Sequence, residues 1–192
     1  MNIKISAILL AAGLSQRMGE DKLRLNYHGK SLLRHSLDLM AELPVFERIV
    51  VTTDARSKCL TFPHGIRSCI NANPEKGLSG SIHAGVKAAA GTHYMFLNAD
   101  QPKLLCSDLL PMLEAVSENP DKIIFPAVGS NPKSPVIFPN RFKGELLKLS
   151  GDNGGRKVRD ANREQCLIFE PENPGNFTDI DDKTDYFYLG ME

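Results

Sequence analysis

Short apolar runs alternate with amphipathic stretches through most of the chain. Residues 5–10 form a continuous, largely apolar run, residues 94–97 form another, and residues 48–53, RIVVTT, are rich in β-branched side chains. Such runs are typical of strands that are covered on both faces, as in a parallel sheet. The stretches between them place apolar residues close to the 3.6-residue period of a helix. This alternation predicts βαβ units with right-handed crossovers, and therefore a mostly parallel sheet flanked by helices.

The expected helices begin at capping residues and end at glycines or polar turns. Ser31 and Ser107 are candidate caps of two helices, and Ser79 or Ser81 is the candidate cap of a third, which Gly91 would stop. Another helix is expected at residues 141–149, and a short polar helix after the glycine-rich break at 151–155. Strands are expected at residues 5–10, 48–53, 67–70, 94–97, 123–126, 135–138 and 167–169, followed by a polar, acidic tail.

Length, charge and cysteine content indicate the number of domains, the classes of partner and the cellular location. A chain of 192 residues predicts one domain over residues 1–192. Lysine and arginine number 23, as do aspartate and glutamate, so no global field favours nucleic acid or an anionic membrane. The apolar N-terminal run leads straight into a glycine-containing segment, which favours a buried strand over a signal peptide. Four scattered cysteines without a CxxC motif favour reduced, buried thiols in a cytoplasmic protein.

Residues 10–22, LAAGLSQRMGEDK, follow the first expected strand, where an open α/β sheet binds its ligands. Small residues allow close backbone approach, and bare N–H groups before a helix attract anions. Arg17 and Lys22 add two cations suited to phosphates. The segment is neither a P-loop nor a GxGxxG motif, because Gly19 is the next glycine after Gly13 and no hydroxyl residue follows Lys22.

Three other segments have both a functional and a structural interpretation. Asp100 follows the strand expected at 94–97, where a carboxylate suits Mg²⁺, although a turn aspartate is also common. Residues 77–81, GLSGS, form a small-residue helix start. Residues 151–156, GDNGGR, make a sharp turn, and residues 178–182, TDIDD, open an acidic tail that composition alone would describe as solvated surface. The histidines form no triad and no GxSxG occurs, so nothing supports covalent catalysis by serine or cysteine.

A family resemblance connects these segments. Residues 9–22 resemble LAAGxSxRMGxDK, the N-terminal motif of the molybdenum cofactor cytidylyltransferases in the MobA-like NTP transferase family. Residues 99–102, ADQP, match the family's G/A-D-x-P, residues 179–181 its D-I-D, and residues 151–156 its G-D-x-G-x-R/K. Two features depart from the family: Asp182-Lys183 replace Thr-Pro, and Ser134 stands where histidine or asparagine is frequent. The resemblance covers residues 5–185 and implies a Rossmann-like three-layer α/β sandwich of the nucleotide-diphospho-sugar transferase type.

The resemblance also implies a reaction, namely transfer of CMP from CTP to molybdopterin or its metal-loaded form, with release of pyrophosphate. Mg²⁺ or Mn²⁺ would be the cofactor, and an apo-molybdoenzyme or its chaperone a transient partner. Lys22 would contact the α-phosphate and Arg17 the β- and γ-phosphates, where both cations would be catalytic. The implied nucleotide-binding residues are Leu10, Ala11, Ala12, Gly13, Leu14, Ser15, Arg17, Lys22, Ser79, Gly80 and Ser81; the metal ligands are Asp100 and Asp181; the acceptor-binding residues are Gln101, Pro102, Ser134, Gly151, Asp152, Gly154 and Arg156.

Three alternative functions stay open. The first is a guanylyltransferase for the same cofactor; guanylyl relatives tend to have LAGG where this chain has LAAG, and a methyl group at Ala12 would crowd a purine. The second is a nucleotidyltransferase for a sugar phosphate or another phosphorylated acceptor, such as methylerythritol phosphate. The third is a carrier of the pterin cofactor without catalysis. Lys22, Asp100 and Asp181 argue against a carrier, because a carrier needs no metal site.

Overall fold

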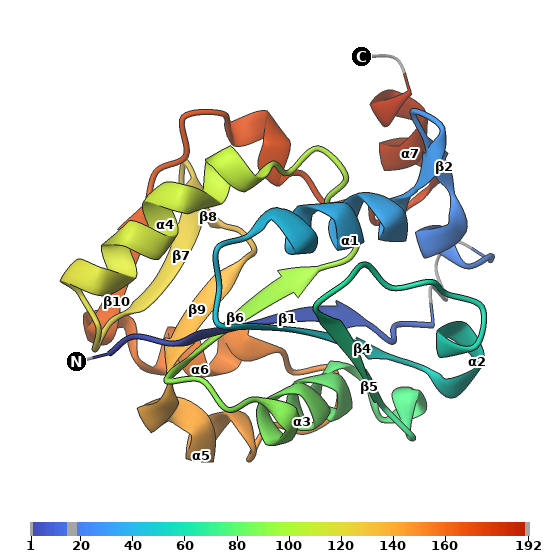
Figure 1. Ribbon diagram of the computed structural model, residues 1–192. Coiled ribbons are helices and arrows are strands. Elements are labelled where there is room, and N and C mark those ends of the chain that lie inside the picture. Colours follow the sequence, from blue (N-terminus) through green and yellow to red (C-terminus); the bar gives the residue numbers. More distant parts are fainter. Residues whose placement is uncertain (1, 15–18, 191–192) are drawn as a thin grey trace.

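The computed structural model describes residues 2–14 and 19–190, and they fold as helices on both faces of a mixed sheet (Figure 1). Within these residues the main sheet has eight strands, in the order β10-β7-β9-β6-β1-β4-β5, with β8 paired to β7. The bounds are β1 Ile5–Ala11, β4 Glu47–Thr52, β5 Ile66–Ile70, β6 His93–Asn98, β7 Ile123–Val128, β8 Asn131–Pro132, β9 Val136–Pro139 and β10 Cys166–Phe169. A separate hairpin joins β2 (Asn26–Tyr27) to β3 (Lys30–Ser31).

The expected fold class, a mostly parallel α/β sandwich, is confirmed. β1 pairs in parallel with β4 and β6, β4 with β5, and β10 with β7. β9 runs antiparallel between β6 and β7. The helices are α1 (Leu32–Glu42), α2 (Asp54–Ser57), α3 (Leu78–Ala88), α4 (Cys106–Glu118), α5 (Lys143–Leu146), α6 (Gly155–Ala161) and α7 (Lys183–Leu189).

The two faces of the sheet bury separate clusters of side chains. In β1, Ala7 and Leu9 pack on the face covered by α1 and α4, whereas Ile8 packs on the face covered by α3, α5 and α6 (Figure 1). Successive residues of a strand point to opposite faces, so a strand covered on both sides needs apolar residues throughout. The two layers of helices therefore explain why β1 is apolar except for Ser6.

Several helix ends differ from the sequence prediction. Ser31 caps α1 as expected, with its hydroxyl accepting from the Arg34 N–H at 3.1 Å. Ser107, however, lies inside α4, which begins after Leu105. Gly77 precedes α3, so neither predicted serine caps it, and α3 ends at Ala88 instead of continuing to Gly91. The helix expected at 141–149 is a 3-10 turn, Asn140–Phe142, followed by the single α-helical turn of α5.

Buried apolar residues anchor the acidic tail, although Asp181 and Asp182 are themselves exposed. Phe177 and Ile180 are fully buried, and α7 follows them. Asp182 and Asp185 form a capping box at the start of α7, a pattern that is readable in the sequence. Ile180 packs with Leu32 of α1, so the tail contributes to a third apolar cluster.

The amino-terminal edge of the sheet is held by Glu47 at the start of β4. Its carboxylate accepts from the Ser6 hydroxyl and the Ala90 N–H, each at 2.6 Å, and from the Arg67 guanidinium at 2.7 Å. Burial by itself raises the pKa of Glu47, but the three hydrogen bonds favour the charged form and hold the pKa below its usual value. Glu47 thus ties β4 to β1, to β5 and to the end of α3.

Cysteine burial is only partly as predicted. Cys59 is exposed, so its predicted burial is wrong, whereas Cys69, Cys106 and Cys166 are partly buried. Burial raises the pKa of each of these three thiols. Among the described helices, none has the length and hydropathy of a membrane span.

Candidate active site

The predicted site segments meet at the carboxyl ends of the central strands. β1 lies between β6 and β4, so the segments that follow these three strands emerge side by side (Figure 1). A pocket of about 450 Å³ opens at this edge. Its lining combines acids, cations and apolar side chains: Leu10, Leu78, Ile82, Phe96, Asn98, Asp100, Pro132, Lys133, Ser134, Val136, Phe138, Asp152, Asn153, Gly154, Gly155, Arg156, Lys157, Arg159, Asp179 and Asp181.

Lys22 lies between the two predicted metal ligands. Its ammonium Nζ donates to Asp100 Oδ2 at 2.5 Å and to Asp181 Oδ1 at 3.4 Å. It also donates to the Ile180 carbonyl oxygen at 2.9 Å. Both carboxylates are therefore within reach of one cation, although Asp181 is 159 residues from Lys22. The three residues come from three separate segments: the start of a 3-10 helix (Lys22–Arg24), the turn after β6 and the tail.

Burial distinguishes the two acids. The side chains of Lys22 and Asp100 are each 15% exposed, whereas that of Asp181 is 49% exposed. Burial raises the pKa of Asp100, the negative charges of Asp179 and Asp181 raise it further, and the Lys22 ammonium opposes the shift. The other oxygen of Asp100, Oδ1, is buried without a hydrogen-bond partner. An unsatisfied buried carboxylate oxygen is costly, and such atoms gather at functional sites.

The tail reaches Asp100 through backbone contacts and one buried amide. The Ile180 N–H donates to the Asp100 carbonyl oxygen at 2.9 Å. Gln101 is 2% exposed, and its Nε2 donates to the Ser134 and Phe177 carbonyl oxygens at 3.2 and 3.3 Å. Gln101, predicted to contact the acceptor, therefore joins three segments beneath the pocket, and Pro102 is buried beside it.

Asp179 and Lys133 are pocket residues that the sequence reasoning did not assign to a role. Lys133 Nζ lies 3.6 Å from Asp179 Oδ2, and Asn98 Nδ2 donates to Asp179 Oδ1 at 3.3 Å. The last residue of β6 and the first acid of the D-I-D motif are thus linked. The signal was present, because Asp179 belongs to the same motif as Asp181.

Two predicted motifs, residues 77–81 and 151–156, contact each other directly. Gly77 has a φ of +84°, and a Cβ there would meet the Gly151 backbone at 2.6–2.7 Å. The Ser79 N–H donates to the Gly151 carbonyl oxygen at 3.1 Å. Only glycine fits so close an approach. Ser79 and Ser81 are buried, with the Ser81 hydroxyl accepting from Asn71 at 3.1 Å. Of residues 77–81, Leu78 lines the pocket, and the predicted Ser79–Gly80–Ser81 set does not.

In the first motif, residues 10–22, the chain passes from buried to exposed at Gly13. Leu10 lines the pocket, whereas Ala11 and Ala12 are buried, Ala12 among the side chains on the α3 face. Gly13 and Leu14 are exposed, and a Cβ at Gly13 would meet no atom within 4 Å. The predicted phosphate ligands Ser15 and Arg17 lie outside the described residues.

Four of the remaining predicted acceptor residues line the pocket. Ser134, Asp152, Gly154 and Arg156 line it, whereas Gly151 lies behind them against α3. Arg159 also lines it and was missed. Its side chain is 8% exposed, its guanidinium lies 4.8 Å from the centre of the Phe125 ring, and Asp160 accepts from it at 2.9 Å. A helix period places Arg159 one turn after Arg156, but no sequence pattern indicated its burial.

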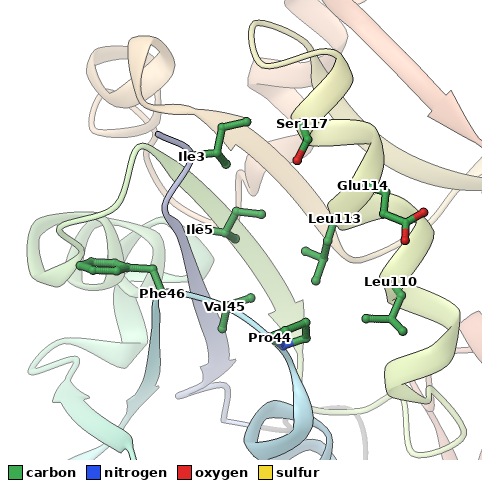
Figure 2. A pocket seen from close by; sticks show the side chains of 9 residues that line it. All are labelled: Ile3, Ile5, Pro44, Val45, Phe46, Leu110, Leu113, Glu114 and Ser117. Carbon is green, nitrogen blue, oxygen red and sulfur yellow. The ribbon is translucent and has the colours of Figure 1, made fainter. Parts of the chain in front are cut away.

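A second pocket, of about 320 Å³, lies at the opposite edge of the sheet (Figure 2). Figure 2 shows Ile5 at the start of β1, Phe46 before β4, and Leu113 on α4 around it. Glu114 and Ser117 are the polar residues in its lining. None of the predicted site residues lines it.

The donor chemistry at Asp100 and Asp181 suits a metal ion that shares its ligands with a substrate. Within residues 2–14 and 19–190, no group of three or more His, Cys, Asp or Glu side chains is arranged to hold a metal ion by itself. Mg²⁺ takes only one or two carboxylates when substrate phosphates and waters complete its octahedron. The unpartnered Oδ1 of Asp100 is a ligand of that type.

Comparison with known proteins gives consistent matches. A family model described as the MobA-like NTP transferase domain matches residues 7–166, which excludes Asp179 and Asp181. A molybdenum cofactor guanylyltransferase of Rhizobium leguminosarum bv. trifolii is 32% identical over 166 residues, 82% of this chain and 74% of its own. Another, of Rhizobium johnstonii, is 28% identical over 163 residues, 81% of this chain and 73% of its own. The crystal structure of Rv0371c from Mycobacterium tuberculosis superposes with a TM-score of 0.84 at 23% identity, covering both chains fully.

Proposed function

The chain belongs to the MobA-like NTP transferase family, and from that premise we propose that it transfers a nucleotidyl group from a nucleoside triphosphate to a phosphorylated pterin, molybdopterin or its metal-loaded form. Pyrophosphate is the second product. The observation that carries the proposal is the Lys22 ammonium held between Asp100 and Asp181, both of which line the pocket. The proposal treats residues 1–192 as one nucleotidyltransferase domain.

Lys22 supports the reaction by its charge. Attack of the acceptor phosphate on the α-phosphate builds negative charge on the α-phosphate oxygens and on the departing pyrophosphate. A preorganised cation stabilises that charge without reorganising in the transition state. Arg17 has the corresponding role for the β- and γ-phosphates in this proposal. A phosphate monoester has a second pKa of about 6, so the attacking oxygen is already ionised and no side chain has to remove a proton.

Asp100 and Asp181 are the residues that would hold a divalent cation. When bound, Mg²⁺ or Mn²⁺ supplies positive charge to phosphate oxygens and orients them. Asp100 contributes the fixed ligand, because it is buried and its backbone is bonded to Ile180. Asp181 is exposed enough to adapt to the nucleotide.

The pocket suits an anionic acceptor with an aromatic ring. Lys133, Arg156, Lys157 and Arg159 bring four cations to its lining, which also contains four aspartates and two phenylalanines. Arginine and lysine bind phosphate, and guanidinium groups also stack on aromatic planes. A pterin that carries a phosphate combines both features. A bare sugar phosphate offers no ring for the apolar part of the lining.

CTP is the nucleotide of this proposal, on the strength of the LAAG segment. GTP is the second candidate, and two observations favour it. The two curated relatives described above are named guanylyltransferases. Ala12 is 2% exposed, packs inside the apolar cluster and is not part of the pocket lining, so its methyl group gives no reason to exclude a purine.

Pyrophosphate release tests the reaction and the nucleotide together. The full chain is incubated with molybdopterin, Mg²⁺ and CTP, GTP, ATP or UTP in turn, and thermal shifts are measured in parallel. A nucleotide at about 100 times its Kd stabilises the protein by roughly 2.7 kcal/mol, which a melting curve resolves. Pyrophosphate release with CTP supports the proposal as stated. Pyrophosphate release with GTP alone would identify the protein as a guanylyltransferase, the second candidate. Binding of molybdopterin without release from any nucleotide would leave the carrier function and refute the enzyme.

A further inference from the structure

Arg56, a residue that no motif identified, joins the two ends of the segment between β1 and the catalytic lysine. Its guanidinium donates to the carbonyl oxygens of Ala11 and Gly13, the latter at 3.3 Å. The same group donates to both oxygens of Asp21, from Nη2 at 2.9 Å and from Nε at 3.3 Å. The Arg56 side chain is 13% exposed, so these bonds are largely shielded from water.

The sheet explains why Arg56 reaches this segment. β4 pairs in parallel with β1, and the last residues of the two strands, Thr52 and Ala11, are partners in the register. Thr53 then caps α2 by accepting the Arg56 N–H at 3.2 Å, which turns the chain back at once. Arg56 is therefore held beside the end of β1 by backbone geometry, before its side chain makes any contact.

Asp21 transmits this restraint to the reacting centre. Its Oδ1 also accepts the Leu23 N–H at 3.2 Å and so caps the short 3-10 helix that begins at Lys22. The orientation of that helix start sets the direction in which the Lys22 side chain leaves the backbone. Lys22 Nζ then reaches Asp100 at 2.5 Å. The Arg56–Asp21 contact is therefore connected to the Lys22–Asp100 contact through the backbone of Asp21, Lys22 and Leu23.

We propose that Arg56 is a positioning residue for Lys22: it fixes Asp21 against the end of β1, and Asp21 fixes the helix start that aims the Lys22 ammonium at Asp100. Two carbonyl oxygens and one carboxylate already accept from the guanidinium, so its charge is used within the protein. Misplacement of a reacting group by about 1 Å costs up to about 100-fold in rate. The inference rests on the proposed nucleotidyl transfer for its kinetic part only.

The kinetic experiment compares Arg56→Met, Arg56→Lys, Lys22→Met and the double variant R56M/K22M. Arg56→Met should lower kcat about 10- to 100-fold, with the folded fraction measured on the same samples. Arg56→Lys should recover only part of this, because one ammonium cannot span Asp21 and both carbonyl groups. The double variant should be no more than about 2-fold slower than Lys22→Met alone, since both substitutions remove one function. Multiplied losses in the double variant would overturn the proposal, as would full recovery by Arg56→Lys.

Arg67→Met is the matched control. Arg67 also donates to a carboxylate and to a backbone carbonyl, Glu47 at 2.7 Å and Ala88 at 2.5 Å, but at the opposite edge of the sheet. It should lower stability and leave kcat unchanged. If Arg67→Met lowered kcat as much as Arg56→Met, the effect would come from a general loss of stability and not from the position of Lys22. That result would overturn the proposal.

A second measurement needs no substrate and separates this inference from the proposed reaction. The Tm loss caused by Lys22→Met is measured in the wild-type and Arg56→Met backgrounds. If Arg56 aims Lys22 at Asp100, the loss should be smaller in the Arg56→Met background. Equal losses would overturn the positioning role even in an active enzyme. The protein could instead show a smaller Tm loss in the Arg56→Met background and yet transfer no nucleotide. That result would refute the proposed function but support the coupling between Arg56 and Lys22.

Discussion

Replacement of Lys22 by methionine tests how strongly the ammonium is coupled to Asp100. Methionine keeps most of the apolar stem and removes the charge, so the variant leaves the Asp100 carboxylate buried without its cation. Removal of one partner from a buried ion pair costs about 3–5 kcal/mol. Both side chains retain 15% exposure, which places the expected loss near the lower end, about 3 kcal/mol. The exposed Asp181, at 3.4 Å, adds little to this figure.

A loss of about 3 kcal/mol corresponds to a fall in Tm of roughly 6–12 °C for a chain of this size. Thermal unfolding followed by circular dichroism measures the fall, and urea unfolding gives the free energy directly. Lys30→Met is the matched control: its ammonium lies 2.7 Å from Asp38, but the side chain is 52% exposed, so its loss should stay below about 1 kcal/mol. Comparable losses in the two variants would refute the argument from burial.

A second substitution distinguishes two causes of the lost stability: loss of the attraction between Lys22 and Asp100, and burial of the Asp100 carboxylate without a counter-charge. In K22M/D100N the buried carboxylate is also gone, so most of the lost stability should return. Mn²⁺ titration provides an independent check. Removal of the ammonium leaves Asp100 and Asp181 to a divalent cation alone, so Mn²⁺ should raise the Tm of Lys22→Met more than that of the wild type. Absence of recovery in K22M/D100N would show that Lys22 stabilises the fold through something other than Asp100.

Three other outcomes are expected. Asp100→Asn and Asp181→Asn should each remove most transferase activity while the circular dichroism spectrum is retained, and the double variant should be scarcely worse than either, since both acids serve one cation. Arg159→Met should raise the KM for the acceptor about 10- to 100-fold and leave the KM for the nucleotide unchanged, which steady-state kinetics will show. The depressed pKa of Glu47 predicts a stabilising contribution that is complete above the ordinary value of 4.5 and is lost as the pH falls through the folded pKa. The Tm difference between wild type and Glu47→Gln should therefore shrink on acidification from pH 7 to pH 3, and a constant difference would contradict this account.

The sequence by itself determined the layers of the fold and the place of Asp100. A strand that is buried on both faces requires apolar residues in succession, and such runs can be recognised in the sequences of β1 and β6. The polar residue that follows such a strand must lie at the ligand-binding edge of the sheet. Lys22 was a candidate phosphate ligand from its place after the first strand, whereas Asp181 could be assigned only through the family motif, because nothing in its local pattern distinguishes it from a surface charge.

The tertiary structure decided which side chains meet. The strand order places the ends of β6, β1 and β4 side by side, so residues distant in sequence converge: Asp181 reaches Lys22 from 159 positions away, and Arg56 reaches Asp21 from 35. Local periodicity describes which face of an element is buried but contains no information on partners across the sheet. Ile180 shows the same limit, since an apolar residue within an acidic tail is anchored only because α1 and α7 enclose it. Its burial brings the neighbouring acid to the end of β6, and that long-range packing, rather than the acidic composition, creates the site.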